Sequence, residues 1–127
     1  MDNIPSNYND IITFVTNNIA YAKIKGSKNN FFEFSESTGK WIKRADCPLE
    51  YTSYSISLNK RGYLGYIYSG KLYEYKPEND VWVKKLSYPG CNSCTYYFGF
   101  AINNVGYIGN ISSCNGDCNS SFYSFLP

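Results

Sequence analysis

The chain repeats one short pattern three times, as Phe31-Phe32-Glu33-Phe34, Leu72-Tyr73-Glu74-Tyr75 and Phe122-Tyr123-Ser124-Phe125. In each copy a single polar residue sits among aromatic or apolar ones. Aromatic residues make up 19% of the chain, and they favour a pleated, half-buried strand over a helix. The three stretches are therefore expected to be equivalent β-strands.

A second set of strands precedes these stretches at a regular spacing. Tyr21, Tyr63 and Tyr107 stand in equivalent positions, 42 and then 44 residues apart. A period in the forties built from short aromatic strands is typical of a β-propeller array. The sequence thus predicts three repeated units in one domain.

Each unit is expected to be a four-stranded antiparallel meander. Asn17, Asn59 and Asn103 coincide when the tyrosines are aligned, and Asn tolerates the left-handed backbone of a tight hairpin. The first two strands are therefore a hairpin. A polar turn after the third strand leads to Trp41 in the first unit and Trp82 in the second, where the fourth strand begins.

The tryptophan spacing resembles the Kelch repeat. In that family, an aromatic residue of the third strand is separated by six residues from a tryptophan, as Phe34 is from Trp41 and Tyr75 from Trp82. The resemblance covers about residues 10–127. It implies propeller blades whose second strand contains glycine.

The expected fold is all-β, with about 11 strands in an incomplete ring. The units divide the chain into a polar leader (1–9), blade 1 (10–50), blade 2 (51–90) and blade 3 (91–127), which lacks its outer strand. Propeller rings need at least about four blades. The open faces are expected to be covered by self-association or by another protein, unless the chain is a piece of a longer one.

Four cysteines lie in two close pairs in the third unit. Cys91 and Cys94 precede its first strand, and Cys114 and Cys118 lie in the link between its second and third strands. Strand alternation brings these two links to the same end of the blade. Three interpretations stay open: a structural zinc site of four thiolates, a pair of disulfides, or free thiols. Cys47 is expected to be a small buried apolar residue.

The residue types argue against catalysis. The chain has no histidine, which removes the usual general base. Glu33 and Glu74 coincide on the third strand, and strand alternation predicts that they point outward rather than form a catalytic pair. No cofactor other than the zinc is implied. The net charge of +2 is too small to indicate nucleic acid as a partner.

We therefore expect a non-catalytic protein-binding or structural module within an oligomer or larger assembly. Aromatic residues of the third unit are the predicted contact residues: Tyr96, Tyr97, Phe122 and Phe125. Several further tyrosines, Tyr54 and Tyr66 among them, are expected at the surface. The alternatives are a carbohydrate-binding or adhesion module and, less favoured by the residues, part of a sugar-acting propeller enzyme.

The N-terminus has neither the basic head nor the apolar run of a secretory signal, and no apolar run reaches the roughly 18 to 20 residues of a membrane span. No membrane attachment is expected. The expected location is the cytoplasm or an assembly such as a virion-like particle, or outside the cell after processing from a longer precursor.

Overall fold

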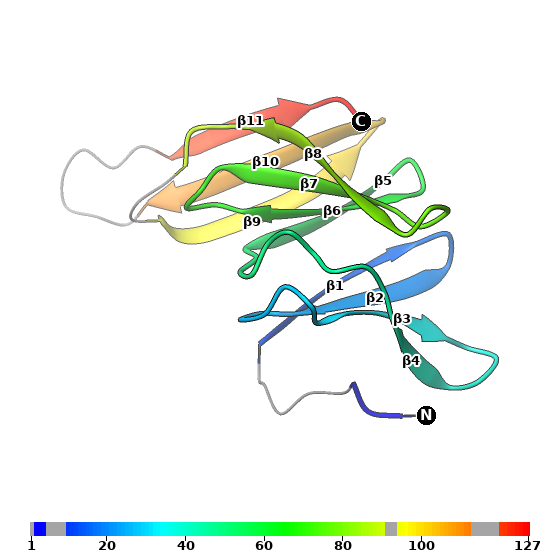
Figure 1. Ribbon diagram of the computed structural model, residues 1–127. Coiled ribbons are helices and arrows are strands. Elements are labelled where there is room, and N and C mark those ends of the chain that lie inside the picture. Colours follow the sequence, from blue (N-terminus) through cyan, green and yellow to red (C-terminus); the bar gives the residue numbers. More distant parts are fainter. Residues whose placement is uncertain (1, 5–9, 91–93, 113–119) are drawn as a thin grey trace.

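The computed structural model describes residues 2–4, 10–90, 94–112 and 120–127, which form three antiparallel sheets and no helix (Figure 1). Eleven strands lie within this described part. Blade 1 contains β1 (Ile11–Thr16), β2 (Ile19–Ile24), β3 (Phe31–Ser35) and β4 (Lys40–Lys43). Blade 2 contains β5 (Tyr54–Leu58), β6 (Arg61–Tyr66), β7 (Lys71–Lys76) and β8 (Val81–Ser87). Blade 3 contains β9 (Cys94–Ile102), β10 (Val105–Ser112) and β11 (Ser121–Phe125).

Each blade is a meander in which consecutive strands pair, and the expected all-β fold is confirmed. The first strands of successive blades, β1, β5 and β9, are neighbours along one side of the stack. Within the described residues, blades 1 and 3 both contact blade 2 and do not contact each other. Among the described residues the three blades therefore form an open row, with blade 1 at one end and blade 3 at the other (Figure 1).

Tight hairpins begin all three blades. The two residues between the first and second strands have positive φ in each case: 53° and 60° at Asn17 and Asn18, and 49° and 62° at Asn103 and Asn104. Asn59 has φ 50° and is followed by Lys60 at 59°. Two consecutive left-handed residues define the type I′ turn, whose twist matches that of paired strands. The role predicted for the repeated asparagines is confirmed.

Two hydrophobic cores hold the array together, one in each gap between blades. The first core lies between blades 1 and 2 and contains Phe14, Tyr21, Phe31, Cys47, Leu49, Leu64 and Tyr75. The second lies between blades 2 and 3 and contains Tyr54, Ile56, Leu58, Tyr63, Ile67, Leu72, Tyr88, Ile108 and Phe125. Each blade therefore owes much of its stability to its neighbour, as in other repeat arrays.

Glycines let the rings of one blade approach the backbone of the next. A Cβ at Gly62 of blade 2 would overlap the ring of Phe14 from blade 1. At Gly99 of blade 3, a Cβ would lie 2.8 Å from Tyr54 Cδ2 and Ile56 Cγ1 of blade 2. In both gaps, large side chains of the earlier blade thus occupy space left by a small residue of the later blade.

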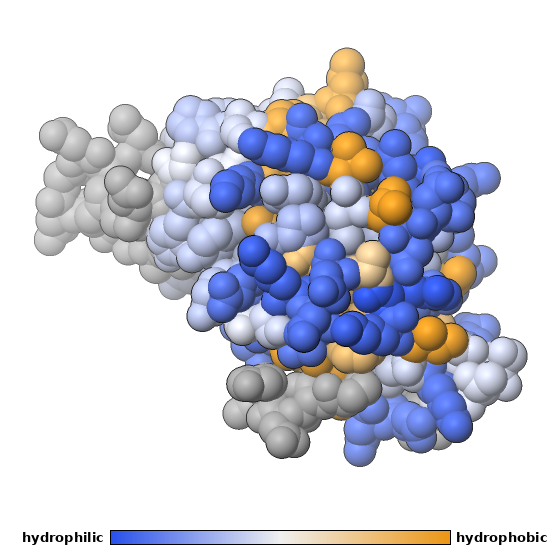
Figure 2. Space-filling model, in the orientation of Figure 1, coloured by the Kyte–Doolittle hydropathy of each residue, from blue (hydrophilic) through white to orange (hydrophobic). Residues whose placement is uncertain are grey.

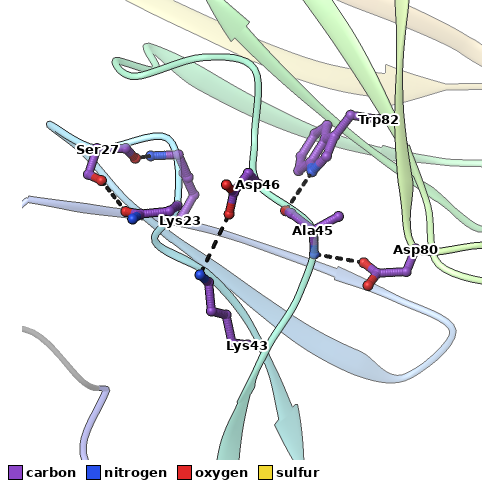
Figure 3. Close-up of polar contacts among 8 residues, drawn as sticks. Lys23, Ser27, Lys43, Ala45, Asp46, Asp80 and Trp82 are labelled. Atoms are coloured by element: carbon purple, nitrogen blue, oxygen red, sulfur yellow. Dashed lines mark hydrogen bonds and ion pairs between the residues drawn. The ribbon is translucent and has the colours of Figure 1, made fainter.

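Polar contacts fix the chain segment that joins blade 1 to blade 2 (Figure 3). The Asp80 carboxylate accepts hydrogen bonds from Ala45 N at 2.9 Å and from the Tyr75 hydroxyl at 2.8 Å. The Trp82 indole donates to Ala45 O at 3.2 Å. The Trp82 ring also lies 4.9 Å from that of Phe31. The tryptophan used to recognise the repeat therefore packs against the preceding blade.

With its buried side chain, Lys23 also binds the segment that joins blade 1 to blade 2. Its side chain is fully buried, and its ammonium donates to the carbonyl oxygens of Ile24, Ser27 and Glu50. The distances to Ser27 O and Glu50 O are 2.5 and 3.4 Å. Burial lowers the pKa of Lys23. Nearby Cys47 is also fully buried, and burial raises the pKa of its thiol to about 11, consistent with the structural role predicted for it.

Replacing Asp80 by Ala is expected to lower the free energy of unfolding by about 2 kcal/mol, because the half-buried Ala45 N–H and the hydroxyl of buried Tyr75 lose their charged acceptor. Asp80 also has a positive φ of 52°, which Asn tolerates better than Ala. Asp80→Asn keeps one acceptor oxygen and is the matched control, with a loss of less than about 1 kcal/mol. Urea denaturation measures both values, and equal losses would contradict this role for the carboxylate.

Alkaline pH is expected to unfold the protein. Burial, assisted by nearby Glu74, raises the pKa of Tyr63 from 10.0 to about 12, and burial raises that of Tyr88 to about 12. Burial also raises the pKa of Tyr21, Tyr54 and Tyr75. An unfolded tyrosine releases its proton near pH 10, whereas these folded tyrosines retain theirs, so the unfolded state binds fewer protons and stability falls as pH rises from 10.

Lys23 opposes this trend, because its lowered pKa makes stability rise with pH up to the pKa of the unfolded lysine. It is one group against the five tyrosines and the Cys47 thiol, whose pKa is also raised. Tyrosinate absorbance and far-ultraviolet circular dichroism, followed together between pH 9 and 12, test the expectation. The loss of β structure should coincide with ionisation of the buried tyrosines. Full ionisation near pH 10 with the sheets intact would contradict it.

Candidate functional site

One face of blade 3 is covered with aromatic side chains. Residues 96, 98, 100 and 102 lie on the same side of β9, because side chains alternate along a strand. On the neighbouring β10, Tyr107 pairs with Phe100 and Gly109 pairs with Phe98, so these two residues lie on the same side. On β11, Phe122 is the partner of Gly109. We call the side chains of Tyr96, Phe98, Phe100, Tyr107 and Phe122 the aromatic face.

The aromatic face is open to solvent. Tyr96 is 64% exposed and Phe122 59%, while Phe98 and Phe100 are each 38% exposed. Two aliphatic residues at its margin are also exposed, Ile102 and Ile111. Contiguous apolar surface of this kind is uncommon on isolated soluble domains and marks sites of interaction.

The rings are ordered relative to one another. Phe100 and Tyr107 stack with their centroids 5.2 Å apart and their planes at 21°. Tyr107 and Phe122 stack at 5.5 Å and 15°, and Phe98 and Phe100 at 6.1 Å and 14°. Stacked rings restrain one another, so the surface requires little side-chain ordering when it binds.

Blade 3 is also nearly free of charge. All 12 lysines and arginines, and all acidic residues except Asp117, lie before residue 86. Figure 2 shows this contrast from one side: strongly hydrophilic residues gather over the middle of the view, and paler residues lie toward the upper left, at the end of blade 3 where β9 begins. Depletion of charge and enrichment in aromatic residues are characteristic of the centres of protein interfaces.

The equivalent residues in the other two blades are buried between blades. Phe14, Tyr21 and Phe31 occupy these positions in blade 1 and lie in the core against blade 2. Ile56, Tyr63 and Leu72 occupy them in blade 2 and lie in the core against blade 3. In the third copy, Phe100, Tyr107 and Phe122 occupy the same positions, and no further blade of the described residues packs against them. The aromatic face is thus a blade-packing surface that no other described blade covers.

The contact residues predicted from the sequence separate onto the two faces of blade 3. Tyr96 and Phe122 belong to the aromatic face. Phe125 is 4% exposed and lies in the core 5.2 Å from the ring of Tyr63, so it joins blade 3 to blade 2 and is not available at the surface. Tyr97 is 36% exposed on the side of β9 that faces blade 2.

Sequence reasoning missed Phe98, Phe100 and Tyr107 as surface residues. Phe100 aligns with Phe14 and Ile56, which the next blade buries. This alignment could have predicted that Phe100 is exposed, because no further described blade packs against blade 3. The expectation that Tyr54 is exposed was wrong. Tyr54 is 3% exposed, and its hydroxyl is 2.5 Å from that of Tyr88 in the core between blades 2 and 3.

The two aligned glutamates are paired with cations. Glu33 accepts a hydrogen bond from Arg44 Nε at 2.9 Å. Glu74 lies 3.5 Å from Arg61 Nε and 3.4 Å from Lys85 Nζ, and it is 6% exposed. The expectation that Glu74 points outward was therefore wrong, because two cations compensate its burial. Glu74 on β7 thus joins β6 and β8, whereas Glu33 on β3 holds Arg44, which directly follows β4.

The predicted metal ligands Cys91, Cys114 and Cys118 lie outside the described residues, and Cys94 is described only as a backbone position. That position, at the start of β9, is the register partner of Ser112 at the end of β10. The chain therefore enters β9 and leaves β10 at the same end of the sheet, as expected. Within the described part of the chain, no group of three or more acidic or cysteine side chains could hold a metal ion. The zinc or disulfide interpretation stays a prediction.

No family model matches this chain, and no curated protein is significantly similar to it. The resemblance to Kelch repeats accordingly depends on the residues quoted above. In the described residues there is also no helix with the length and hydrophobicity needed to cross a membrane.

Two phenylalanines of β11 provide a matched test of the two faces. Phe125→Ala removes a buried ring from the core and is expected to cost about 3 to 5 kcal/mol of stability. Phe122→Ala, three residues earlier on the exposed face, is expected to cost less than about 1 kcal/mol. Thermal or urea unfolding measures the difference, and equal costs would show that Phe122 is part of the folded core.

Proposed function

We propose that this chain is a non-catalytic protein-binding or structural module, built from Kelch-like repeats, that uses its aromatic face to join a larger assembly. The observation that carries this proposal is the equivalence of Phe100, Tyr107 and Phe122 with residues that are buried between blades elsewhere in the chain. The side of blades 1 and 2 that packs against the next blade has an equivalent on blade 3, and there it is exposed.

The chemistry of the surface favours binding over catalysis. The aromatic face has no carboxylate, amine or guanidinium, whereas it offers rigid rings that can be desolvated at low cost. The buried carboxylate of Glu74 is engaged by Arg61 and Lys85. A partner that binds here gains the free energy of removing apolar surface from water without having to strip charged groups of their hydration.

A photo-crosslinking phenylalanine analogue at position 122 tests the proposal. The matched control carries the analogue in place of Val83, which is 38% exposed on β8 of blade 2 and thus outside the aromatic face. After irradiation in an extract of the source cells, we expect covalent protein adducts from position 122, either with a second copy or with another protein, and few from position 83.

The double variant Phe98→Ser with Phe100→Ser should abolish the adducts formed at position 122, with the far-ultraviolet spectrum unchanged. Adducts of equal yield at positions 122 and 83, or none at 122, would overturn the proposal. Binding of the wild-type chain on a glycan array in the absence of any protein adduct would replace it with the carbohydrate-binding alternative.

A further inference from the structure

The two gaps inside this chain follow one packing rule. We call the side of a blade that meets the next blade in sequence its leading face, and the opposite side its trailing face. The leading face presents large side chains: Phe14 of blade 1, and Tyr54 with Ile56 of blade 2. The trailing face receives them at small residues, Gly62 and Gly99. The partner of the aromatic face, which is a leading face, should therefore be a trailing face with small residues.

Blade 1 has no other described blade against its trailing face. Its innermost strand, β1, presents Ile11, Thr13 and Val15 on that side, and all three are exposed, with Val15 at 57%. By alignment Thr13 takes the place of Gly99, and Ala20 on β2 takes the place of Gly62. Blade 1 thus offers small or β-branched residues at the positions where the later blades receive large side chains.

The exposed side of β1, formed by Ile11, Thr13 and Val15, is expected to make the main contact with another blade. In both internal gaps the innermost strands are neighbours. Between blades 1 and 2, Ser55 Oγ of β5 donates to Thr13 O of β1 at 2.7 Å. Between blades 2 and 3, Tyr54 and Ile56 of β5 pack against Gly99 of β9. Farther from this strand, Ala22 and Phe32 on the same side of blade 1 are already buried. A blade that docks on blade 1 therefore makes its main contact on β1.

We propose that the occupant of the aromatic face is a second copy of this chain, bound through the trailing face of its blade 1. This inference rests on the proposed function and names the partner. Such a contact joins different surfaces of the two copies. Contacts of this kind form a closed ring when a whole number of the rotations that relate neighbouring copies adds up to 360°. Two copies of the three described blades make six blades, within the range of about four to eight found in closed propellers. Both aromatic faces are then covered.

Packing of two aromatic faces against each other fits the structure less well. Within the aromatic face, the one glycine that could receive a ring is Gly109, and its space is already filled because a Cβ there would overlap the ring of Phe98. Two such faces would therefore place mostly rings against rings, and the one small exposed side chain on this side of the described strands, Ser124, lies beside Tyr107 at the margin on β11. The head-to-tail arrangement instead places a leading face on a trailing face, as in both internal gaps.

Sedimentation velocity on the purified chain, at micromolar to millimolar concentration, measures the assembly. The expected mass is twice 14.5 kDa. Val15→Asp on the trailing face of blade 1 and Phe122→Asp on the aromatic face should each give a monomer, because each variant loses both contacts of the ring. Val83→Asp, which lies outside both surfaces, is the matched control and should stay dimeric.

Mixing the two monomeric variants decides between the arrangements. In the head-to-tail dimer, the intact aromatic face of Val15→Asp can bind the intact blade 1 of Phe122→Asp, so an equimolar mixture should recover a dimer held by one contact. This recovery also shows that both variants are folded. A dimer of Val15→Asp alone would overturn the proposal in favour of paired aromatic faces.

A wild-type chain that stays monomeric at millimolar concentration would overturn the second-copy proposal but not the proposed function, which predicts adducts with another protein at position 122. A mass above that of two copies would overturn the six-bladed ring. Failure of the mixture to recover a dimer, with both variants showing the wild-type far-ultraviolet spectrum, would overturn the head-to-tail contact.

Discussion

The packing of large side chains from one blade against small residues of the next is the interaction on which the rest of this structure depends. Phe14 lies over Gly62, and Tyr54 and Ile56 lie over Gly99. Because protein interiors are close-packed, an added side chain at Gly62 or Gly99, or the loss of a ring opposite either of them, would require the two blades to shift. The same constraint determines the spacing of the blades and explains why the two cores lie between sheets.

Polar contacts complement this packing by fixing the connections. Asp80 and Trp82 of blade 2 both bind Ala45 in the segment that leaves blade 1, and Lys23 holds the carbonyl oxygen of Glu50 in the same segment. Backbone groups in a partly buried connection need partners, and these side chains supply them. Burial of the lysine ammonium is compensated by three carbonyl oxygens, which limits the cost of placing a cation next to an apolar core.

Local chemistry made much of the fold predictable. Asn17, Asn59 and Asn103 indicated hairpins because asparagine tolerates positive φ, and the tryptophan spacing indicated the fourth strands of the first two blades. Burial that depends on distant partners was harder to predict. Glu74 can be buried because it forms ion pairs with Arg61 and Lys85, and no local sequence pattern predicts these ion pairs. Tyr54 pairs with Tyr88, which is 34 residues away.

The candidate site was predictable only in part. Strand alternation separates Phe122 from Phe125, but which of the two is exposed depends on whether another blade follows, and alternation alone does not determine this. The aligned positions Phe14, Ile56 and Phe100 carry the missing information, because they show which side of a blade faces its successor. Comparison among the three units therefore says more about the site than the residues of the third unit alone.

The near absence of charge in blade 3 has a kinetic consequence. Charged patches accelerate association by steering partners toward each other, and this acceleration is lost at high ionic strength. A partner that approaches the aromatic face receives little such guidance, so its association rate is set by unguided diffusion and orientation, commonly about 10⁵ to 10⁶ M⁻¹s⁻¹. The lifetime of the complex then depends on how slowly the stacked rings of Phe100, Tyr107 and Phe122 are returned to water.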